Sequence, residues 1–197
     1  MNTFSATPYK VVLVGSMSTG KTCIQSWMKD KIFSETPMPT IGACYFRYSV
    51  QIPNYKCTIL DVWDTSGDER YRNVMPIYFR DCDGAIVVFD LSNRETFNDL
   101  DFWVDMVRLN TDNDIPIIIV GAKSDLTHEV TTEELTRFCL DIQCTYILCS
   151  SKLGYNIEEL FIEVAKLVST RQPKGYSPVQ DHVVPLEDSV IKESPCC

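Results

Sequence analysis

The sequence has no excess of positive charge, no long apolar run and no Cys-x-x-Cys pair. Its 197 residues carry a formal net charge of −9, which argues against nucleic acid as a partner because phosphate contacts need clustered lysine and arginine. The longest apolar run, near residues 115–120, is far shorter than the roughly 20 residues that cross a bilayer. No Cys-x-x-Cys pair is present to bind zinc.

The nine cysteines are odd in number and scattered along the chain. Most of them lie within apolar runs, as do Cys57, Cys139, Cys144 and Cys149. No secretory signal precedes them, so we expect reduced, buried thiols in the cytosol rather than a disulfide scaffold.

Short apolar segments alternate with amphipathic segments over residues 1–170, and 45% of the chain is hydrophobic, which suits the core of one domain. The alternation predicts an α/β fold with a six-stranded, mostly parallel sheet and helices on both faces. A Pro53-Asn54 turn predicts one antiparallel edge strand. We expect strands near residues 8–14, 43–51, 56–63, 84–90, 115–121 and 144–149. We expect helices near residues 20–30, 70–80, 94–110, 131–141 and 156–169, with helix starts at Thr132 and Asn156.

A glycine-rich segment after the first expected strand fits the spacing Gly-x4-Gly-Lys-Ser/Thr. It comprises Gly15, Ser16, Met17, Ser18, Thr19, Gly20, Lys21 and Thr22. Such a loop holds phosphate oxygens with backbone N–H groups at a helix N-terminus. Lys21 would reach the outer phosphates, and the Thr22 hydroxyl would hold Mg²⁺. An ordinary glycine turn is the alternative, but the amphipathic segment that begins at Cys23 favours the phosphate loop.

Three further segments that follow apolar strands bear on the same ligand. Asp64 places a carboxylate where it can hold the Mg²⁺ shell, and Gly67 offers a backbone N–H that can approach a γ-phosphate. Asp125 can accept hydrogen bonds from both N1–H and the exocyclic amine of guanine. Adenine presents the opposite pattern, so Asp125 favours GTP over ATP. The segment Ser150, Ser151 and Lys152 would complete the base pocket.

These four segments, in this order and spacing, make the chain resemble the Ras superfamily of small GTPases, and it is most similar to the Rab family. The Rab-like features are Trp63, residues 69–72 and 78–80, and the terminal pair Cys196 and Cys197. The resemblance covers about residues 8–170 and the last two cysteines. It implies a P-loop NTPase fold, GTP or GDP and Mg²⁺ as ligands, and hydrolysis of GTP.

The resemblance also assigns roles to aromatic and switch residues. Thr40 matches the first-switch threonine that coordinates Mg²⁺ and contacts the γ-phosphate when GTP is bound. Phe33 matches the aromatic residue that packs across guanine, although a loop-anchoring role is the alternative. Tyr45, Trp63 and Tyr78 match the aromatic triad on which Rab effectors dock, with core packing as the alternative for each.

The site implied by the motifs and the resemblance is therefore a defined set. Its metal ligands are Thr22, Thr40 and Asp64. Its catalytic residues are Lys21, Thr40, Gly67 and Asp68. Besides the phosphate loop, its nucleotide-binding residues are Cys23, Phe33, Thr40, Asp64, Gly67, Ala122, Lys123, Asp125, Ser150, Ser151 and Lys152.

Three positions depart from the family pattern. Asp68 stands where a hydrolysing relative has glutamine to orient the attacking water, and an ionised aspartate is shorter and only accepts hydrogen bonds. Met17 stands where Ras proteins often have glycine. Ala122 replaces the asparagine that ties the guanine loop to the phosphate loop, which should weaken nucleotide binding by about 1–3 kcal/mol. We therefore expect slow hydrolysis.

The composition changes at residue 171, since four of the ten prolines fall within the last 27 residues. This predicts a flexible tail over residues 171–197. Cys196 and Cys197 resemble a double geranylgeranylation site, and two lipid chains hold a protein on a bilayer far better than one. The tail has no polybasic cluster, so lipid rather than charge would anchor it. Two unmodified thiols are the alternative.

The Rab resemblance implies effectors, an exchange factor, a Rab escort protein and a GDP-dissociation inhibitor as partners. It implies the cytoplasmic face of a Golgi or endosomal membrane, with a cytosolic pool, and residues 75–81 and 154–156 are similar to Rabs of Golgi traffic. The leading hypothesis is a GTP-dependent membrane switch. A non-enzymatic Rab-like scaffold with weak or permanently bound nucleotide is one alternative. A P-loop kinase is another, but no lid insertion separates the motifs.

Overall fold

The computed structural model describes residues 7–53, 57–112 and 114–174. Cys196 and Cys197, most of the expected tail and Asn54 of the expected turn lie outside them. The described residues form a sheet of order β2-β3-β1-β4-β5-β6. All its neighbours pair in parallel except β2 and β3, which confirms the predicted fold. The strands are β1 (Tyr9–Val14), β2 (Ala43–Gln51), β3 (Cys57–Thr65), β4 (Gly84–Asp90), β5 (Ile117–Ala122) and β6 (Thr145–Leu148).

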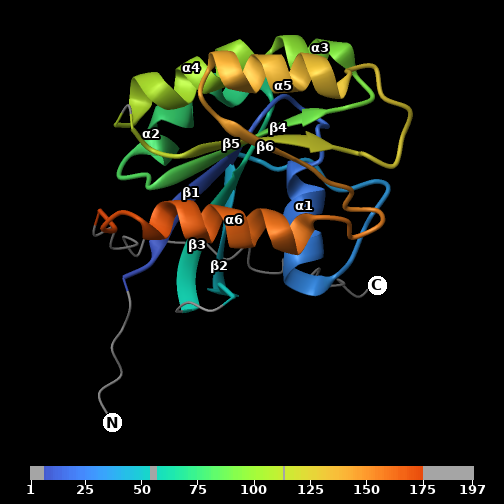
Figure 1. Cartoon of the computed structure of the whole chain (residues 1–197). Helices are drawn as coiled ribbons and strands as arrows, with labels where there is room; N and C mark the ends of the chain where they lie inside the picture. The colour runs from blue at the N-terminus through green and yellow to red at the C-terminus, as the bar shows by residue number, and fades with distance from the viewer. Residues whose placement is uncertain (1–6, 54–56, 113, 175–197) are drawn as a thin grey trace, which may run out of the picture.

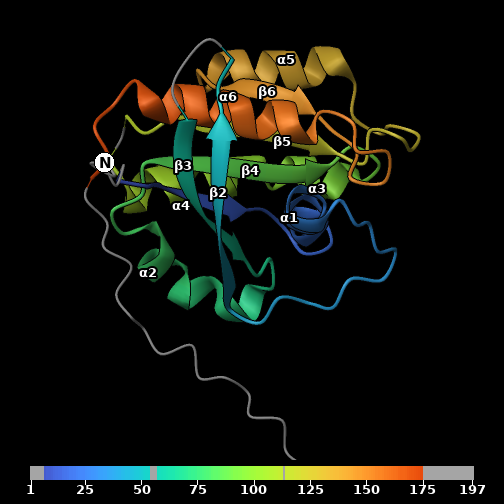
Figure 2. The same ribbon diagram turned by 90° about the horizontal axis from the view of Figure 1, so that it is seen from below.

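Helices cover both faces of the sheet (Figures 1 and 2). One face carries α1 (Lys21–Asp30) and α6 (Ile157–Ser169). The other face carries α2 (Met75–Phe79), α3 (Arg94–Asn98), α4 (Leu100–Asn110) and α5 (Thr132–Asp141). Among the described residues, no helix is long and apolar enough to cross a membrane.

The central strand β1 shows why both faces must be covered. All six of its residues are buried, and side chains of a strand alternate between faces. Val11 and Leu13 join the hydrophobic cluster under α1 and α6, whereas Val12 and Val14 join the cluster under α4 and α5. A strand buried on both faces needs a continuous apolar run, and this is the pattern that predicts it.

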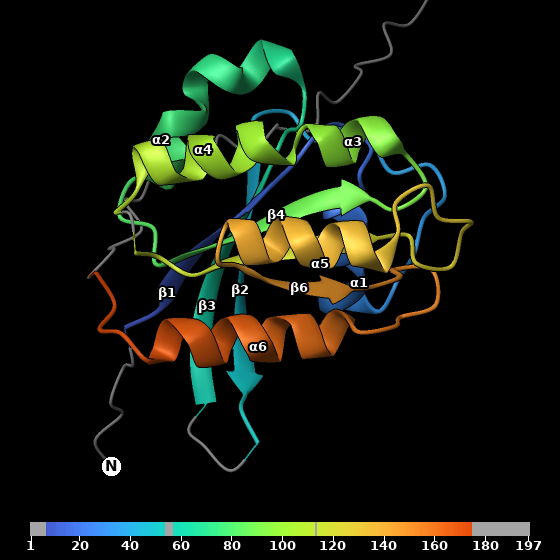
Figure 3. The same ribbon diagram turned by 45° about the horizontal axis from the view of Figure 1, so that its top comes forward.

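Two of the expected helices are divided. The segment expected over 70–80 is a 3-10 helix, η1 (Glu69–Val74), followed by α2. Pro76 lies in the first turn of α2, where its missing N–H is not needed. The segment expected over 94–110 is α3 and α4, which run in one line on either side of Asp99 (Figure 3).

The helix starts and two of the named cysteines also differ from expectation, and one of these, Cys144, is only half-buried. Thr131, not Thr132, caps α5, because it forms a reciprocal capping box with Glu134. Asn156 does precede α6, but with a left-handed backbone and no side-chain cap; its amide donates to the carbonyl of Leu148 instead. Cys57 is exposed rather than buried, because it begins β3 at the far end of the β2–β3 ladder.

Candidate functional site

A cavity of about 600 Å³ opens at the carboxyl ends of the parallel strands, the edge at which open α/β sheets bind ligands. The loops after β1, β3, β5 and β6 contribute to its wall, together with the segment before β2. Predicted residues in the wall are Met17, Ser18, Gly20, Lys21, Thr22, Cys23, Phe33, Thr40, Gly67, Asp68, Ala122, Lys123, Asp125, Ser151 and Lys152. Five other predicted residues do not line it, namely Gly15, Ser16, Thr19, Asp64 and Ser150.

The loop between β1 and α1 is built around Lys21. Its ammonium group donates to the carbonyl oxygens of Gly15 at 2.8 Å and Ser16 at 2.7 Å, so the lysine closes the loop on itself. Burial lowers the pKa of Lys21 to about 8. The charge of Asp64 offsets only part of this effect, and an anion in the cavity would raise the pKa of Lys21 back towards its ordinary value.

Two glycines let backbone segments meet at this loop. A Cβ on Gly15 would lie 2.1 Å from the carbonyl oxygen of Val88, and its φ of +140° disfavours any side chain. A Cβ on Gly67 would lie 2.5 Å from the carbonyl carbon of Ser16 and 2.6 Å from Nζ of Lys21. The loop after β3 therefore approaches the phosphate loop as closely as two backbones can.

Two hydroxyls and one carboxylate meet beside the lysine. The hydroxyl of Thr22 donates to Oδ2 of Asp64 at 2.8 Å and lies 2.8 Å from the hydroxyl of Thr40. Thr40 lies 3.4 Å from the same carboxylate oxygen. Asp64 Oδ1 is buried and has no hydrogen-bond partner, and burial raises the pKa of this carboxyl to about 6. An unpaired, buried carboxylate oxygen beside two hydroxyls fits a hard divalent cation such as Mg²⁺.

The base side of the cavity is anchored by hydrogen bonds between loops. Asp125 accepts a hydrogen bond of 2.5 Å from the hydroxyl of Ser150, and Ser150 also accepts from the backbone of Leu153. Lys123 forms an ion pair of 2.5 Å with Asp90. The loops after β4, β5 and β6 are thus tied together around the carboxylate that the sequence assigns to guanine.

Asp68 is engaged by a neighbouring arginine. Its carboxylate accepts three hydrogen bonds of 2.7–3.1 Å from the guanidinium of Arg70 and one of 2.9 Å from the backbone of Arg70. These bonds lower the pKa of Asp68, so the carboxylate is ionised. Arg70 itself lines the cavity; the sequence placed it among the Rab-like residues 69–72 but gave it no role in the site.

The side chain of Ser16 points away from the cavity. Its hydroxyl donates to Oδ2 of Asp99 at 2.7 Å and accepts from the indole N–H of Trp103 at 3.0 Å. Trp103 is fully buried in α4. The phosphate loop is therefore fastened to the α3–α4 junction. The sequence did not predict either partner. Asp99 is 83 positions and Trp103 is 87 positions from Ser16, too far for any local sequence pattern to reveal the contact.

The expected aromatic triad is contiguous. Ring centroids of Tyr45 and Trp63 lie 5.4 Å apart, and those of Trp63 and Tyr78 lie 5.9 Å apart. Tyr45 is 40% exposed, whereas the other two are half-buried against the core beneath α2. Trp63 and Tyr78 thus pack partly against the core, and Tyr45 lies at the surface beside them.

A sheet with a glycine-rich loop after β1 and a buried lysine behind it defines a P-loop nucleotide-binding protein. Residues 10–170 match the Ras family. The chain is 35% identical to Ras-related protein Rab-5B of Plasmodium falciparum, over 84% of this chain and 80% of the relative. It is 32% identical to Ras-related protein Rab-4A of Homo sapiens, over 85% and 77%. It is 35% identical to a probable Rab-related GTPase of Acanthamoeba polyphaga mimivirus, over 78% and 73%.

The chain belongs to the Ras family of small GTPases, in the Rab group. Proteins of this family in general bind GTP or GDP with Mg²⁺ and hydrolyse GTP.

Proposed function

We propose that this protein is a guanine-nucleotide-dependent membrane switch with slow GTP hydrolysis. The observation that carries the proposal is the convergence of three features on one cavity: the lysine of the phosphate loop, the cluster of Thr22, Thr40 and Asp64, and the base-side carboxylate of Asp125. These three features would bind the triphosphate, its metal and the guanine base of one nucleotide, respectively.

Each part of the cavity binds one part of the nucleotide. Asp125 accepts hydrogen bonds from guanine, with Lys123 beneath the base and Phe33 across it. Ser151 and Lys152 complete this pocket, and Ser150 orients Asp125 through the 2.5 Å bond. The backbone of the phosphate loop, from Gly15 through Cys23, surrounds the phosphates.

Hydrolysis depends on how the γ-phosphate end of the cavity is arranged. Lys21 neutralises charge on the outer phosphates, and the backbone N–H groups of Thr40 and Gly67 orient them. Thr22, Thr40 and Asp64 would hold Mg²⁺, which would supply further charge neutralisation when bound. Asp68 accepts a hydrogen bond from the attacking water but donates none, and its charge repels the phosphate. Cleavage is therefore slow.

The rest of the molecule couples the bound nucleotide to effector binding and to membrane association. GTP orders the first switch through Thr40 and presents the triad of Tyr45, Trp63 and Tyr78 to effectors. Residues 1–170 form the GTPase domain, and the tail over 171–197 carries geranylgeranyl groups on Cys196 and Cys197. An exchange factor, a Rab escort protein and a GDP-dissociation inhibitor act on the protein. It resides on the cytoplasmic face of a Golgi or endosomal membrane, with a cytosolic pool.

One observation favours a second function, a membrane-anchored scaffold that binds nucleotide without turning it over. Arg70 holds the carboxylate of Asp68 by three side-chain hydrogen bonds, which withdraws it from a water. The rates of GTP cleavage and nucleotide release distinguish the two, because a scaffold cleaves none in the lifetime of the complex.

The base-pocket assignment is tested by Asp125→Asn. This change replaces the acceptor of the guanine amine by a group suited to xanthine. GTP affinity should fall and XTP affinity should rise, measured by equilibrium titration of both nucleotides. GTP affinity that survives the substitution unchanged would overturn the assignment.

A further inference from the structure

The guanine loop lacks one of its expected tethers. Ala122 is the last residue of β5 and 97% of its surface is buried. Its Cβ faces the phosphate loop, 3.7 Å from where a Cβ on Gly20 would lie. A methyl group at this place donates and accepts no hydrogen bond. The residue that follows, Lys123, has a left-handed backbone with φ of +59°, which costs free energy in any residue but glycine. The backbone N–H of Leu126 donates to the Lys123 carbonyl at 3.0 Å and supports this turn. Another contact must hold the ammonium group of Lys123.

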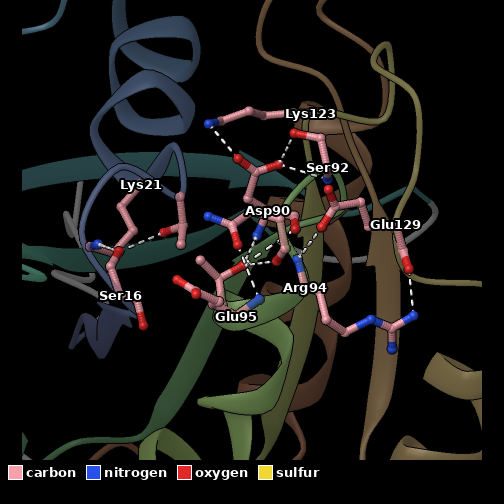
Figure 4. Close-up of polar contacts among 11 residues, drawn as sticks. Ser16, Lys21, Asp90, Ser92, Arg94, Glu95, Lys123 and Glu129 are labelled. Atoms are coloured by element: carbon pink, nitrogen blue, oxygen red, sulfur yellow. Dashed lines mark hydrogen bonds and ion pairs between the residues drawn. The ribbon is translucent and has the colours of Figure 1, made fainter.

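Asp90 lies where it can do so. In the β4–β5 register it is paired with Ala122, so Lys123 is one residue beyond its partner. Oδ2 of Asp90 lies 2.5 Å from Nζ of Lys123, and Asp90 is nearly buried, with 6% of its surface exposed. Figure 4 shows the carboxylate of Asp90 between Lys123 and Ser92.

The other contacts of Asp90 fix its orientation. Oδ1 accepts from the backbone N–H of Ser92 at 2.8 Å and from its hydroxyl at 2.7 Å. The backbone N–H of Asp90 donates to the hydroxyl of the buried Thr96 at 3.0 Å. One carboxylate oxygen is thus committed to the loop that leads to α3, and the other is directed at the ammonium group. The ion pair joins the end of β4 to the loop after β5, and its two residues are more than thirty positions apart in the sequence.

We propose that Asp90 is a positioning residue for Lys123 and replaces the tether that Ala122 has lost. The inference rests on the proposed function, since Lys123 acts there beneath the guanine base. With the ammonium group fixed on Asp90, the methylene stem of Lys123 lies along the wall of the cavity, of which it is part. An ion pair with a nearly buried carboxylate is screened far less than a surface pair. This ion pair holds the methylene stem of Lys123 in the position where a planar base would pack against it.

The test is a double-mutant cycle on GDP affinity. Asp90→Asn, Lys123→Met and the double variant are titrated with GDP in Mg²⁺, and GDP release is timed by displacement. Asp90→Asn should weaken GDP binding by about tenfold or more, which is the effect of one charge-assisted hydrogen bond. In the Lys123→Met background the same change should have almost no effect, because Asp90 acts through Lys123.

A rescue and a control separate positioning from general loss of structure. Ala122→Asn adds a second tether, so it should reduce the loss caused by Asp90→Asn. Asp83→Asn is the matched control: it removes another buried carboxylate, which precedes β4 at the opposite edge of the sheet and binds the backbone of Lys10. Asp83→Asn should leave GDP affinity unchanged.

The outcomes distinguish this inference from the function on which it rests. If the unaltered protein fails to bind GDP, the proposed function is overturned and this inference falls with it. If it binds GDP but Asp90→Asn binds equally well, only the role of Asp90 is overturned. Losses that simply add in the double variant would also overturn it, since Asp90 would then act independently of Lys123.

Discussion

Asp68 differs from the glutamine of active relatives in charge and in what it can donate. The sequence predicts that the negative charge of Asp68 faces the triphosphate. The structure adds that the guanidinium of Arg70 partly neutralises this charge through hydrogen bonds of 2.7–3.1 Å. The arginine of this pair is exposed, since its side chain is 80% accessible, whereas that of Asp68 is 21% accessible. A pair with one exposed partner contributes little free energy. A glutamine at position 68 would not form this ion pair, so its amide would be free to contact the attacking water.

We expect Asp68→Gln to raise the rate of single-turnover GTP cleavage by about tenfold, equivalent to ~1.4 kcal/mol of transition-state stabilisation. Met17→Gly should increase the gain, because the 62% exposed side chain of Met17 lines the cavity and would crowd an attacking water. Protein preloaded with GTP gives this rate without exchange. The control is Glu69→Gln, which removes the adjacent charge where Glu69 pairs with Arg72. A rate that is unchanged or lower in Asp68→Gln would show that another residue orients the water.

A second prediction at this scale concerns Ser16. Its hydroxyl satisfies both Asp99 and the buried indole of Trp103. Ser16→Ala leaves both without that partner, and we expect a loss of about 1–3 kcal/mol in the free energy of unfolding. Urea titration of the nucleotide-free protein measures it, with Ser49→Ala on the exposed side of β2 as the control. Equal midpoints for Ser16→Ala and the control would mean that this contact does not hold the phosphate loop.

At the scale of elements, hydrophobic periodicity and loop spacing account for most of the fold. The buried run of β1 and the Gly-x4-Gly-Lys-Thr loop predict a strand, a turn and a helix, because each is local in sequence. The contacts of Asp90 with Lys123 and of Ser16 with Trp103 are not predictable in this way. They arise only when strand order brings distant loops to one edge. The same holds for Cys57, whose exposure depends on where the β2–β3 ladder ends.

The capping of α5 makes a pH-dependent contribution to stability. Glu134 accepts hydrogen bonds from Arg94 and from both the backbone and the hydroxyl of Thr131. The guanidinium of Arg94 is the main cause that lowers the pKa of Glu134 to about 2. Because the folded-state pKa lies below the ordinary 4.5, this stability is present above about pH 4.5 and is lost as the pH falls towards 2.

Glu134→Gln should therefore weaken the fall in thermal stability between pH 4.5 and 2. The melting temperature, recorded across this range, is the measurement. Glu133→Gln is the matched control, since Glu133 is the neighbouring exposed acid in the same turn. If the two variants show the same pH profile, the ties of Glu134 to Arg94 and Thr131 do not contribute to stability.

At the scale of the whole molecule, the start of the tail is fastened far from the nucleotide site. The carbonyl of Arg171 accepts from the hydroxyl of Tyr9 at 2.9 Å. Lys174 forms an ion pair of 2.7 Å with Asp112 and donates its backbone N–H to Asp83 at 3.1 Å. These partners precede β1, β4 and β5 or begin them, so they mark the amino edge of the sheet. The last described residues, 171–174, are therefore held at the edge opposite the nucleotide cavity.

We expect the variant Cys196→Ser/Cys197→Ser to leave membranes for the soluble fraction while keeping its nucleotide affinity, because both residues follow the domain. Fractionation of cells that express either form measures the change. The control is Cys44→Ser/Cys57→Ser, which removes two exposed thiols of the domain and should stay on membranes. Equal membrane association of the terminal variant and the unaltered protein would exclude the lipid anchor.

We propose above that the cavity binds a guanine nucleotide with Mg²⁺. The most direct measurement is an equilibrium titration of nucleotide-free protein with GTP and with ATP, each with and without Mg²⁺. We expect GTP to bind at least about a hundredfold more tightly than ATP, since Asp125 would face mismatched groups of adenine. We also expect removal of Mg²⁺ to weaken GTP binding, because Thr22, Thr40 and Asp64 would then lack the ion that we propose they hold. Equal affinity for GTP and ATP, or no binding of GTP, would contradict it.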